Sequence, residues 1–196
     1  PRITIKDCIK VNKKIKTALG VRLHVTSALH TDFVSLFIAG NSTGIVVPRI
    51  LEDYELLQIK KSFDNVLVLD TDYTAIGNLI LLNDKGIILS PLLRKHADAV
   101  KKFFDLPCVV SRIAGTVVVG SAAVATNKGC LLHPKVKGTE KNLIEATLQV
   151  HSDIGTVNFG SSFVKSGIIA NSHGLVGSES CSGPELGRIN ETLGFD

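Results

Sequence analysis

The chain has 196 residues, of which 44% are hydrophobic and 20% are charged, and its net charge is +4. This is the composition of an ordinary globular protein, and it excludes a membrane helix, because no apolar run approaches the roughly 20 residues that cross a bilayer. The four cysteines form no C-x-x-C pair and no zinc-spaced cluster, so we expect reduced thiols, a cytoplasmic location and no metal or other cofactor.

The first predicted element is a basic helix. Residues 1–24 carry seven basic side chains and one acidic one. One apolar helix face is formed by Ile5, Cys8, Ile9, Ile15 and Leu19. Gly20 ends this helix, and a strand is predicted over residues 21–25. Such a basic stretch can meet phosphate, but it is more often the solvated face of a helix.

Four similar segments follow along the chain. Each has an apolar run, a polar turn, a glycine and a second apolar run. The turn glycines are Gly44, Gly86, Gly129 and Gly174, with spacings of 42, 43 and 45 residues. Each segment therefore predicts a β-hairpin, in which the glycine supplies a positive φ. The regular spacing identifies an internal repeat.

A helix and then a strand are predicted after each hairpin. The expected helix faces are Leu56, Ile59 and Phe63; Val100, Phe103 and Phe104; Leu143, Ile144 and Leu148; and Leu186, Ile189 and Leu193. Thr139 is the expected N-cap of the third helix, and Ser182 with Glu185 has capping-box spacing for the fourth. Closing strands are predicted over residues 66–69, 108–110 and 156–159.

These units predict an α/β (α+β) fold with central strands and outer helices. We expect a single domain over residues 1–196. Its predicted repeats are 1–30, which is incomplete, 31–73, 74–116, 117–162 and 163–196.

Several stretches resemble the translation initiation factor 6 family. They are AIGN at 75–78 with NDKG at 83–86, VGS at 119–121 with TNKG at 126–129 and HP at 133–134, GTVNFGS at 155–161, and GPEL at 183–186. They occur in order and at matching spacing from about Val25 to the C-terminus. The resemblance implies the pentein fold, a β/α propeller of five ββαβ units around a pseudo-fivefold axis. The short C-terminus is similar to that of the archaeal form.

The resemblance implies a non-enzymatic factor that binds the large ribosomal subunit near the sarcin–ricin loop and blocks association with the small subunit. Ribosomal proteins and rRNA would be its partners, a GTPase would take part in its release, and a monomer is expected. Three departures stand out. By the repeat period, about 25 residues of the family's first unit are absent. Val34 stands where other repeats carry glycine, and Cys181 where the family has a small hydroxyl residue.

Position by position, the resemblance implies a ribosome-binding surface where the chain enters each core strand. Its predicted members are Ser35, Asn78, Ser121, Ala122 and Asp53, with Asn158 added by symmetry and Val164 as the fourth strand entrance. Lys85, Lys128 and Lys165 are possible rRNA phosphate contacts. The alternative is structural: Asn78 and Asn158 could satisfy backbone groups in turns, and the lysines could simply be solvated.

Two other functions fit parts of the sequence. Related penteins modify guanidines with a late cysteine, and Cys181 precedes a predicted helix, with His133, His173, Glu179 and Glu185 as partners. An RNA-binding module acting through the basic N-terminal helix is the second alternative, although the chain has only two tyrosines and no tryptophan.

Overall fold

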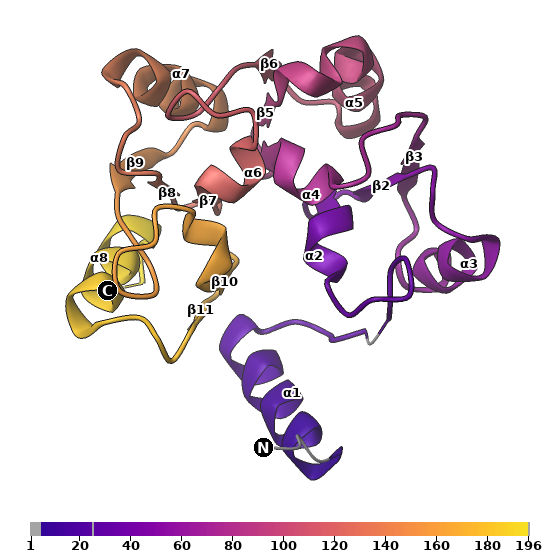
Figure 1. Cartoon of the computed structure of the whole chain (residues 1–196), viewed down its shortest axis with the longest axis horizontal. Coiled ribbons are helices and arrows are strands. Elements are labelled where there is room, and N and C mark those ends of the chain that lie inside the picture. Colours follow the sequence, from indigo (N-terminus) through magenta and orange to yellow (C-terminus); the bar gives the residue numbers. More distant parts are fainter. Residues whose placement is uncertain (1–4, 25, 196) are drawn as a thin grey trace.

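The computed structural model describes residues 5–24 and 26–195, with side chains from residue 11 onward. It is a mixed α/β fold in which long helices lie outside and strands lie nearer the centre (Figure 1). The outer helices are α1 (Ile5–Leu19), α3 (Asp53–Ser62), α5 (Ala97–Phe104), α7 (Gly138–Leu148) and α8 (Gly183–Leu193). A 3₁₀ helix, η1 (Pro91–His96), leads into α5. None of the helices in this described part is long and apolar enough to cross a bilayer.

The strands form small sheets that share one design. Their bounds are β1 (Ala39–Gly40), β2 (Ile45–Pro48) and β3 (Val66–Leu69); β4 (Ile80–Leu82), β5 (Ile87–Leu89) and β6 (Cys108–Val110); β7 (Ala123–Ala125), β8 (Gly129–Leu132) and β9 (His151–Ile154); and β10 (Ile168–Ala170) and β11 (Leu175–Gly177). The first two strands of each group form an antiparallel hairpin. In the three groups of three strands, the third strand pairs in parallel with the second. The four predicted hairpins are confirmed.

Two predicted closing strands are wrong. The strand expected over residues 156–159 lies earlier, at β9, and Val157 and Ser161 instead form an isolated bridge around a turn. Residues 21–24 form no strand. The third predicted helix begins earlier than expected, since Lys137 and not Thr139 is the N-cap residue of α7.

The hairpin glycines have a different role from the one predicted. None of Gly44, Gly86, Gly129 and Gly174 has a positive φ. A Cβ atom at Gly86 would overlap the carbonyl oxygen of Thr147, in the last turn of α7, and one at Gly129 would overlap that of Thr192, in α8. These glycines let a hairpin pack directly against the end of the next outer helix.

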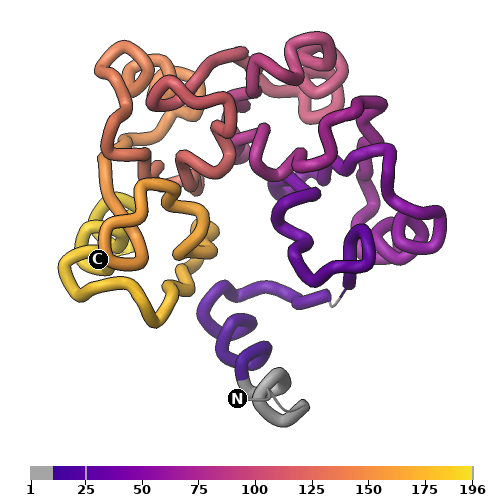
Figure 2. The backbone as a smooth tube through the Cα atoms, viewed as in Figure 1, coloured from indigo at the N-terminus to yellow at the C-terminus, as the bar shows by residue number. Residues whose placement is uncertain are grey.

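The same packing holds α1 against the last hairpin. A Cβ atom at Gly174 would overlap the carbonyl oxygen of Ala18, and Asn171 donates an Nδ2 hydrogen bond to Leu19 O at 2.8 Å. The tube trace shows α1 reaching this hairpin by its C-terminal end (Figure 2). Gly20 has the predicted left-handed cap conformation. The expectations for Val25 and for the side chains of residues 5–10 lie outside the described residues.

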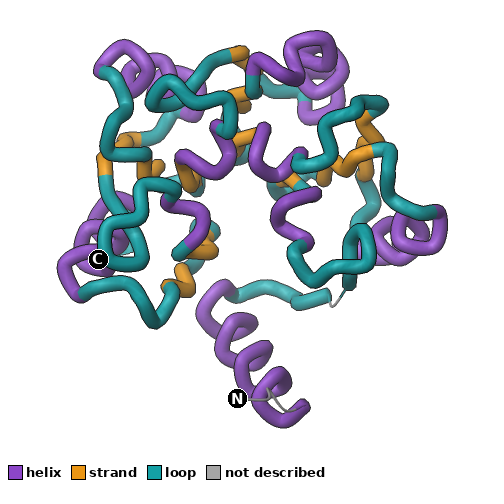
Figure 3. The backbone as a smooth tube through the Cα atoms, in the orientation of Figure 1, coloured by secondary structure: helices purple, strands orange, loops and turns teal. Residues whose placement is uncertain are grey.

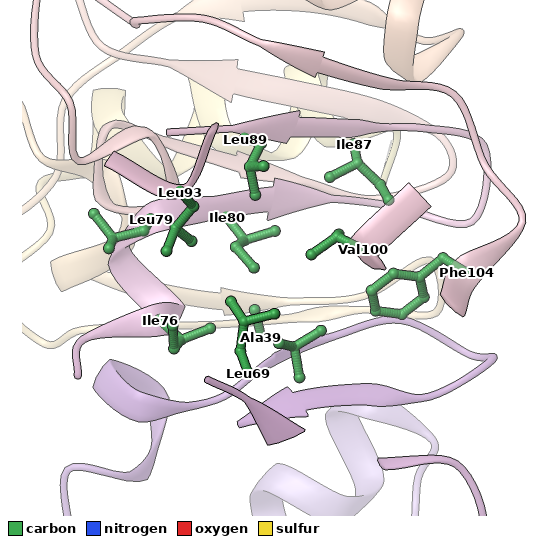
Figure 4. Packing of buried hydrophobic residues seen from close by; sticks show 11 residues of the cluster. Ala39, Leu69, Ile76, Leu79, Ile80, Ile87, Leu89, Leu93, Val100 and Phe104 are labelled. Carbon is green, nitrogen blue, oxygen red and sulfur yellow. The ribbon is translucent and has the colours of Figure 1, made fainter. Parts of the chain in front are cut away.

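The core is a set of apolar clusters between neighbouring units. The residues of one such cluster come from β1 to β5, from η1 and α5, and from the short helix α4 (Ile76–Leu79), and all are nearly or fully buried (Figure 4). Because three of the four clusters draw side chains from two sheets, neighbouring units stabilise one another.

Candidate functional site

Four short helical turns lie around the centre of the molecule. They are α2 (Val34–Phe37), α4 (Ile76–Leu79), α6 (Val119–Ala122) and η2 (Val164–Ser166), and each immediately precedes the first strand of a hairpin. They contact in series, α2 with α4, α4 with α6, and α6 with η2. Figures 1 and 3 show α2, α4 and α6 surrounding the middle of the molecule, inside the ring of outer helices.

Hydrogen bonds fix which residues of the turns are equivalent. The third residue of each turn donates its backbone N–H to the residue before the turn, at 3.0 Å in all four cases. The donors are Leu36, Asn78, Ser121 and Ser166. Our alignment of Ser35 and Val164 with Asn78 is therefore wrong. Ser35 and Lys165 occupy the second position, together with Gly77 and Gly120. Val34 is consequently not in the glycine position, and the repeated apolar pairs Phe33–Val34, Val118–Val119 and Phe163–Val164 could have revealed this register.

The glycines at the second position allow the turns to approach closely. A Cβ atom at Gly77 would overlap Ser35 O, and one at Gly120 would overlap Gly77 O. Carbonyl oxygens at this position therefore lie directly against the next turn in the series.

The predicted surface residues do not all lie on one surface. Asn78 and Ser121 are half-buried third residues of their turns, and Ser35 is exposed beside them. Ala122 is fully buried, so it cannot belong to a contact surface. Asp53 begins α3, on the outside of the molecule (Figure 1). Sequence reasoning missed Leu36 and Ser166, which occupy the same position as Asn78.

Lys165 lies in η2 and is half-buried. Its Nζ donates to Gly77 O at 2.6 Å and to Ser35 O at 3.2 Å, on the far side of the centre. Burial lowers the pKa of Lys165 to about 8. The ammonium is thus engaged with backbone carbonyls of this chain, which does not fit the predicted phosphate contact.

The other two lysines are also engaged within the protein. Lys85 Nζ donates to Gln149 O at 3.1 Å, and Lys128 Nζ donates to Gly194 O at 3.4 Å. Gln149 and Gly194 are the C-cap residues of α7 and α8. Carbonyls at a helix C-terminus lack intrahelical partners and favour a cation. These hairpin lysines therefore cap the next outer helix.

A cavity of about 270 Å³ lies among the turns and first strands. Its walls are mainly Ile, Leu and Ala side chains, and Lys165 is the single ionisable residue among those that line it. No group of three or more potential metal ligands occurs within the described residues.

Comparison with known proteins identifies the family. Residues 3–192 match the model of the eIF-6 family. The chain belongs to the eIF-6 family. It is similar to the protein named translation initiation factor 6 of Methanocaldococcus jannaschii, with 40% identity over 93% of this chain and 83% of that protein. The protein of the same name from Haloquadratum walsbyi is 39% identical, over 83% of this chain and 73% of that protein, and the one from Pyrococcus horikoshii is 35% identical, over 92% and 83%.

Family membership confirms the resemblance seen in the sequence. It also confirms the prediction that the chain is not an enzyme, because the homologous proteins are named translation initiation factor 6, a factor that is not an enzyme. Cys181 lies among backbone groups and the side chain of Asn158. Its buried Sγ lies 3.5 Å from the backbone nitrogen of Asn158 and 3.9 Å from Gly167 O, and none of its described hydrogen-bond partners is a histidine.

Asn158 lies in a left-handed turn and not on a strand as predicted, with φ 52°. The turn is held by Glu185 of α8, whose carboxylate accepts hydrogen bonds from Phe159 N and Gly160 N at 3.1 and 2.9 Å. Glu140 of α7 accepts N–H groups of Ala114 and Gly115 in the same way. The glutamate of the GPEL stretch at residues 183–186, which resembles the family, therefore has a structural role, because it holds the turn before η2.

We expect the hydrogen bonds of the Glu185 carboxylate to stabilise the fold at neutral pH and to lose this effect in acid. Burial acts to raise its pKa, but hydrogen bonds from Ser182, Thr156 and Gly160 outweigh burial and lower the pKa to about 2. The contribution is therefore present above the unfolded-state pKa of about 4.3 and is lost as the pH falls from there to about 2. We expect Glu185→Gln to destabilise the protein at pH 7 and less at pH 3, measured by urea unfolding.

The control for this experiment is Glu179→Gln. Glu179 is exposed, and no hydrogen bond involves its carboxylate within the described residues. Its substitution should leave the pH dependence unchanged. A Glu185→Gln protein with the wild-type acid profile would contradict the assignment.

Proposed function

We propose that this chain is a translation factor that binds the large ribosomal subunit near the sarcin–ricin loop and sterically prevents its association with the small subunit. The curated relatives carry the name translation initiation factor 6, which supports a role in translation. We further propose the pentein architecture, with one domain made of the repeats 1–30, 31–73, 74–116, 117–162 and 163–196. A monomer in the cytoplasm, released with the help of a GTPase, fits this role.

The observation that supports the proposed surface is its chemistry. None of the residues of α2, α4 and α6 carries a charge, and Asn78 and Ser121 offer hydrogen-bonding groups between apolar neighbours. The residues before two of the turns, Phe33 and Phe163, are 69% and 43% exposed. Interface centres are typically poor in charge and rich in aromatic side chains. We call the set Phe33, Leu36, Asn78, Ser121, Phe163 and Ser166 the turn surface.

Co-sedimentation with purified ribosomal subunits tests this function. We expect the protein to pellet with large subunits and not with small ones, and to reduce the yield of joined particles when both are mixed. Pelleting with both subunits, or with the large subunit without any effect on joining, would contradict the proposal.

A second candidate function is RNA binding through α1. Lys13, Lys14 and Lys16 are exposed on this helix, and its C-terminal end contacts the last hairpin. Binding by these lysines would extend to naked RNA and would weaken steeply with salt, because counterions are released. Binding to naked RNA as tight as binding to large subunits would favour this function over the proposed one.

A further inference from the structure

The backbone carbonyls at the second position of the turns form an unusual environment for a lysine. Ser35 and Gly77 occupy this position in α2 and α4, and their carbonyl oxygens accept hydrogen bonds from Lys165 Nζ. Lys165 occupies the same position in η2. The residue at the second position of η2 therefore reaches across the centre and binds the backbone of the residues at the same position in α2 and α4.

The contacts of Lys165 join the two ends of the series of turns. The turns contact one another in the order α2, α4, α6 and η2. The most extensive packing between η2 and α2 therefore runs through the two turns between them. The Lys165 side chain bridges this distance directly, because its Nζ lies 3.2 Å from Ser35 O at the other end of the series.

Among the described residues, the ammonium donates hydrogen bonds to backbone carbonyls alone. The elements beside it, α2, α4, α6, β7 and β10, consist of uncharged residues, and no described carboxylate forms an ion pair with Lys165. The ring of His133 packs against Phe163, two residues before Lys165 in the chain, with centroids 5.5 Å apart. Partial burial of a charged group without an ion pair costs free energy. The hydrogen bonds to the two carbonyl oxygens offset part of this cost, so they determine where the ammonium lies.

We propose that Lys165 is a positioning residue of the turn surface. Its ammonium fixes η2 relative to α2 and α4, and so sets the spacing of Ser166, Leu36 and Asn78. We call the hydrogen bonds from Lys165 Nζ to Ser35 O and Gly77 O the clamp. The proposal rests on the proposed function only in taking the turn surface as the ribosome-facing one, whereas the clamp is a property of the free protein.

Lys165→Met tests the clamp, because methionine has a similar stem and no donor. We expect amide hydrogen exchange of Leu36 and Asn78, whose N–H groups are hydrogen-bonded, to rise about tenfold or more, and affinity for large subunits to fall about tenfold. Lys128→Met is the matched control. Lys128 also donates to a backbone carbonyl, but at the end of an outer helix, so its loss should change neither quantity.

Chemical rescue separates a clamp from a merely structural side chain. Lys165→Ala removes the atoms of one propylammonium ion, so added propylammonium chloride should restore the slow exchange of Leu36 and Asn78. Tetramethylammonium chloride carries the same charge but no N–H donor, and should restore nothing.

The outcomes distinguish the two proposals. Wild-type protein that fails to pellet with large subunits would overturn the proposed function, while the exchange and rescue results would still test the clamp. Unchanged exchange in Lys165→Met would overturn the clamp. Loss of subunit binding with unchanged exchange would instead make Lys165 a direct contact, and faster exchange with unchanged binding would show that the clamp does not position the turn surface.

Discussion

Gly86→Ala is expected to lower the free energy of unfolding by about 3 kcal/mol, because the new methyl group meets backbone that cannot easily move. The added Cβ would overlap the carbonyl oxygen of Thr147. This carbonyl lies in the last turn of α7, and the adjacent Leu148 O accepts a 2.9 Å hydrogen bond from Asn83. Relieving the overlap would move the hairpin away from α7 and break that hydrogen bond. Urea unfolding at neutral pH measures the loss.

Gly187→Ala is the matched control for this substitution. Gly187 lies on the exposed side of α8, and a Cβ atom there would meet nothing within 4 Å. Alanine is a better helix former than glycine, so we expect this variant to be more stable than wild type by about 0.5 to 1 kcal/mol. Equal destabilisation by both substitutions would contradict the contact between hairpin and helix.

Asn78→Lys is expected to reduce affinity for the large subunit about 30-fold, or about 2 kcal/mol. Asn78 lies in α4, between α2 and α6, so a lysine there would place a new charge among three turns that contain no charged residue. Burying that charge against a partner without an ion pair is unfavourable. Titration of labelled protein with large subunits measures the change.

Asn190→Lys adds the same charge on the outside of α8, where Asn190 is exposed. We expect this control to bind large subunits as wild type does. If the Asn78→Lys protein lost thermal stability in proportion to its affinity, Asn78 would be a structural residue of its turn, as the alternative reading of the sequence allows.

The sequence predicts the hairpins and most outer helices well because both depend on local patterns. The capping box of Ser182 and Glu185 and the left-handed Gly194 are present as expected, since a helix end is determined by a few neighbouring residues. The role of the hairpin glycines could not be predicted, because the Thr147 carbonyl that excludes a side chain at Gly86 lies about 60 positions away in the sequence.

The register of the four turns could be predicted only in part, for a similar reason. Residue types aligned Ser35 with Asn78, whereas hydrogen bonds align Leu36 with it. A leucine and an asparagine share no chemical signal that would reveal equivalent places in a fold. The lysines were predicted from charge alone. Their carbonyl partners come from other units, so nothing near Lys85 or Lys165 in the sequence indicates them.

The contact between Asn171 and Leu19 has a consequence for biosynthesis. Asn83 binds Leu148, which follows it in the chain, but Asn171 binds a residue 152 positions before it. A nascent chain makes α1 early and the hairpin that holds it late. During synthesis, α1 therefore lacks this contact until most of the polypeptide has left the exit tunnel. Contacts so distant in sequence form slowly, and we expect docking of α1 to be among the last steps of folding.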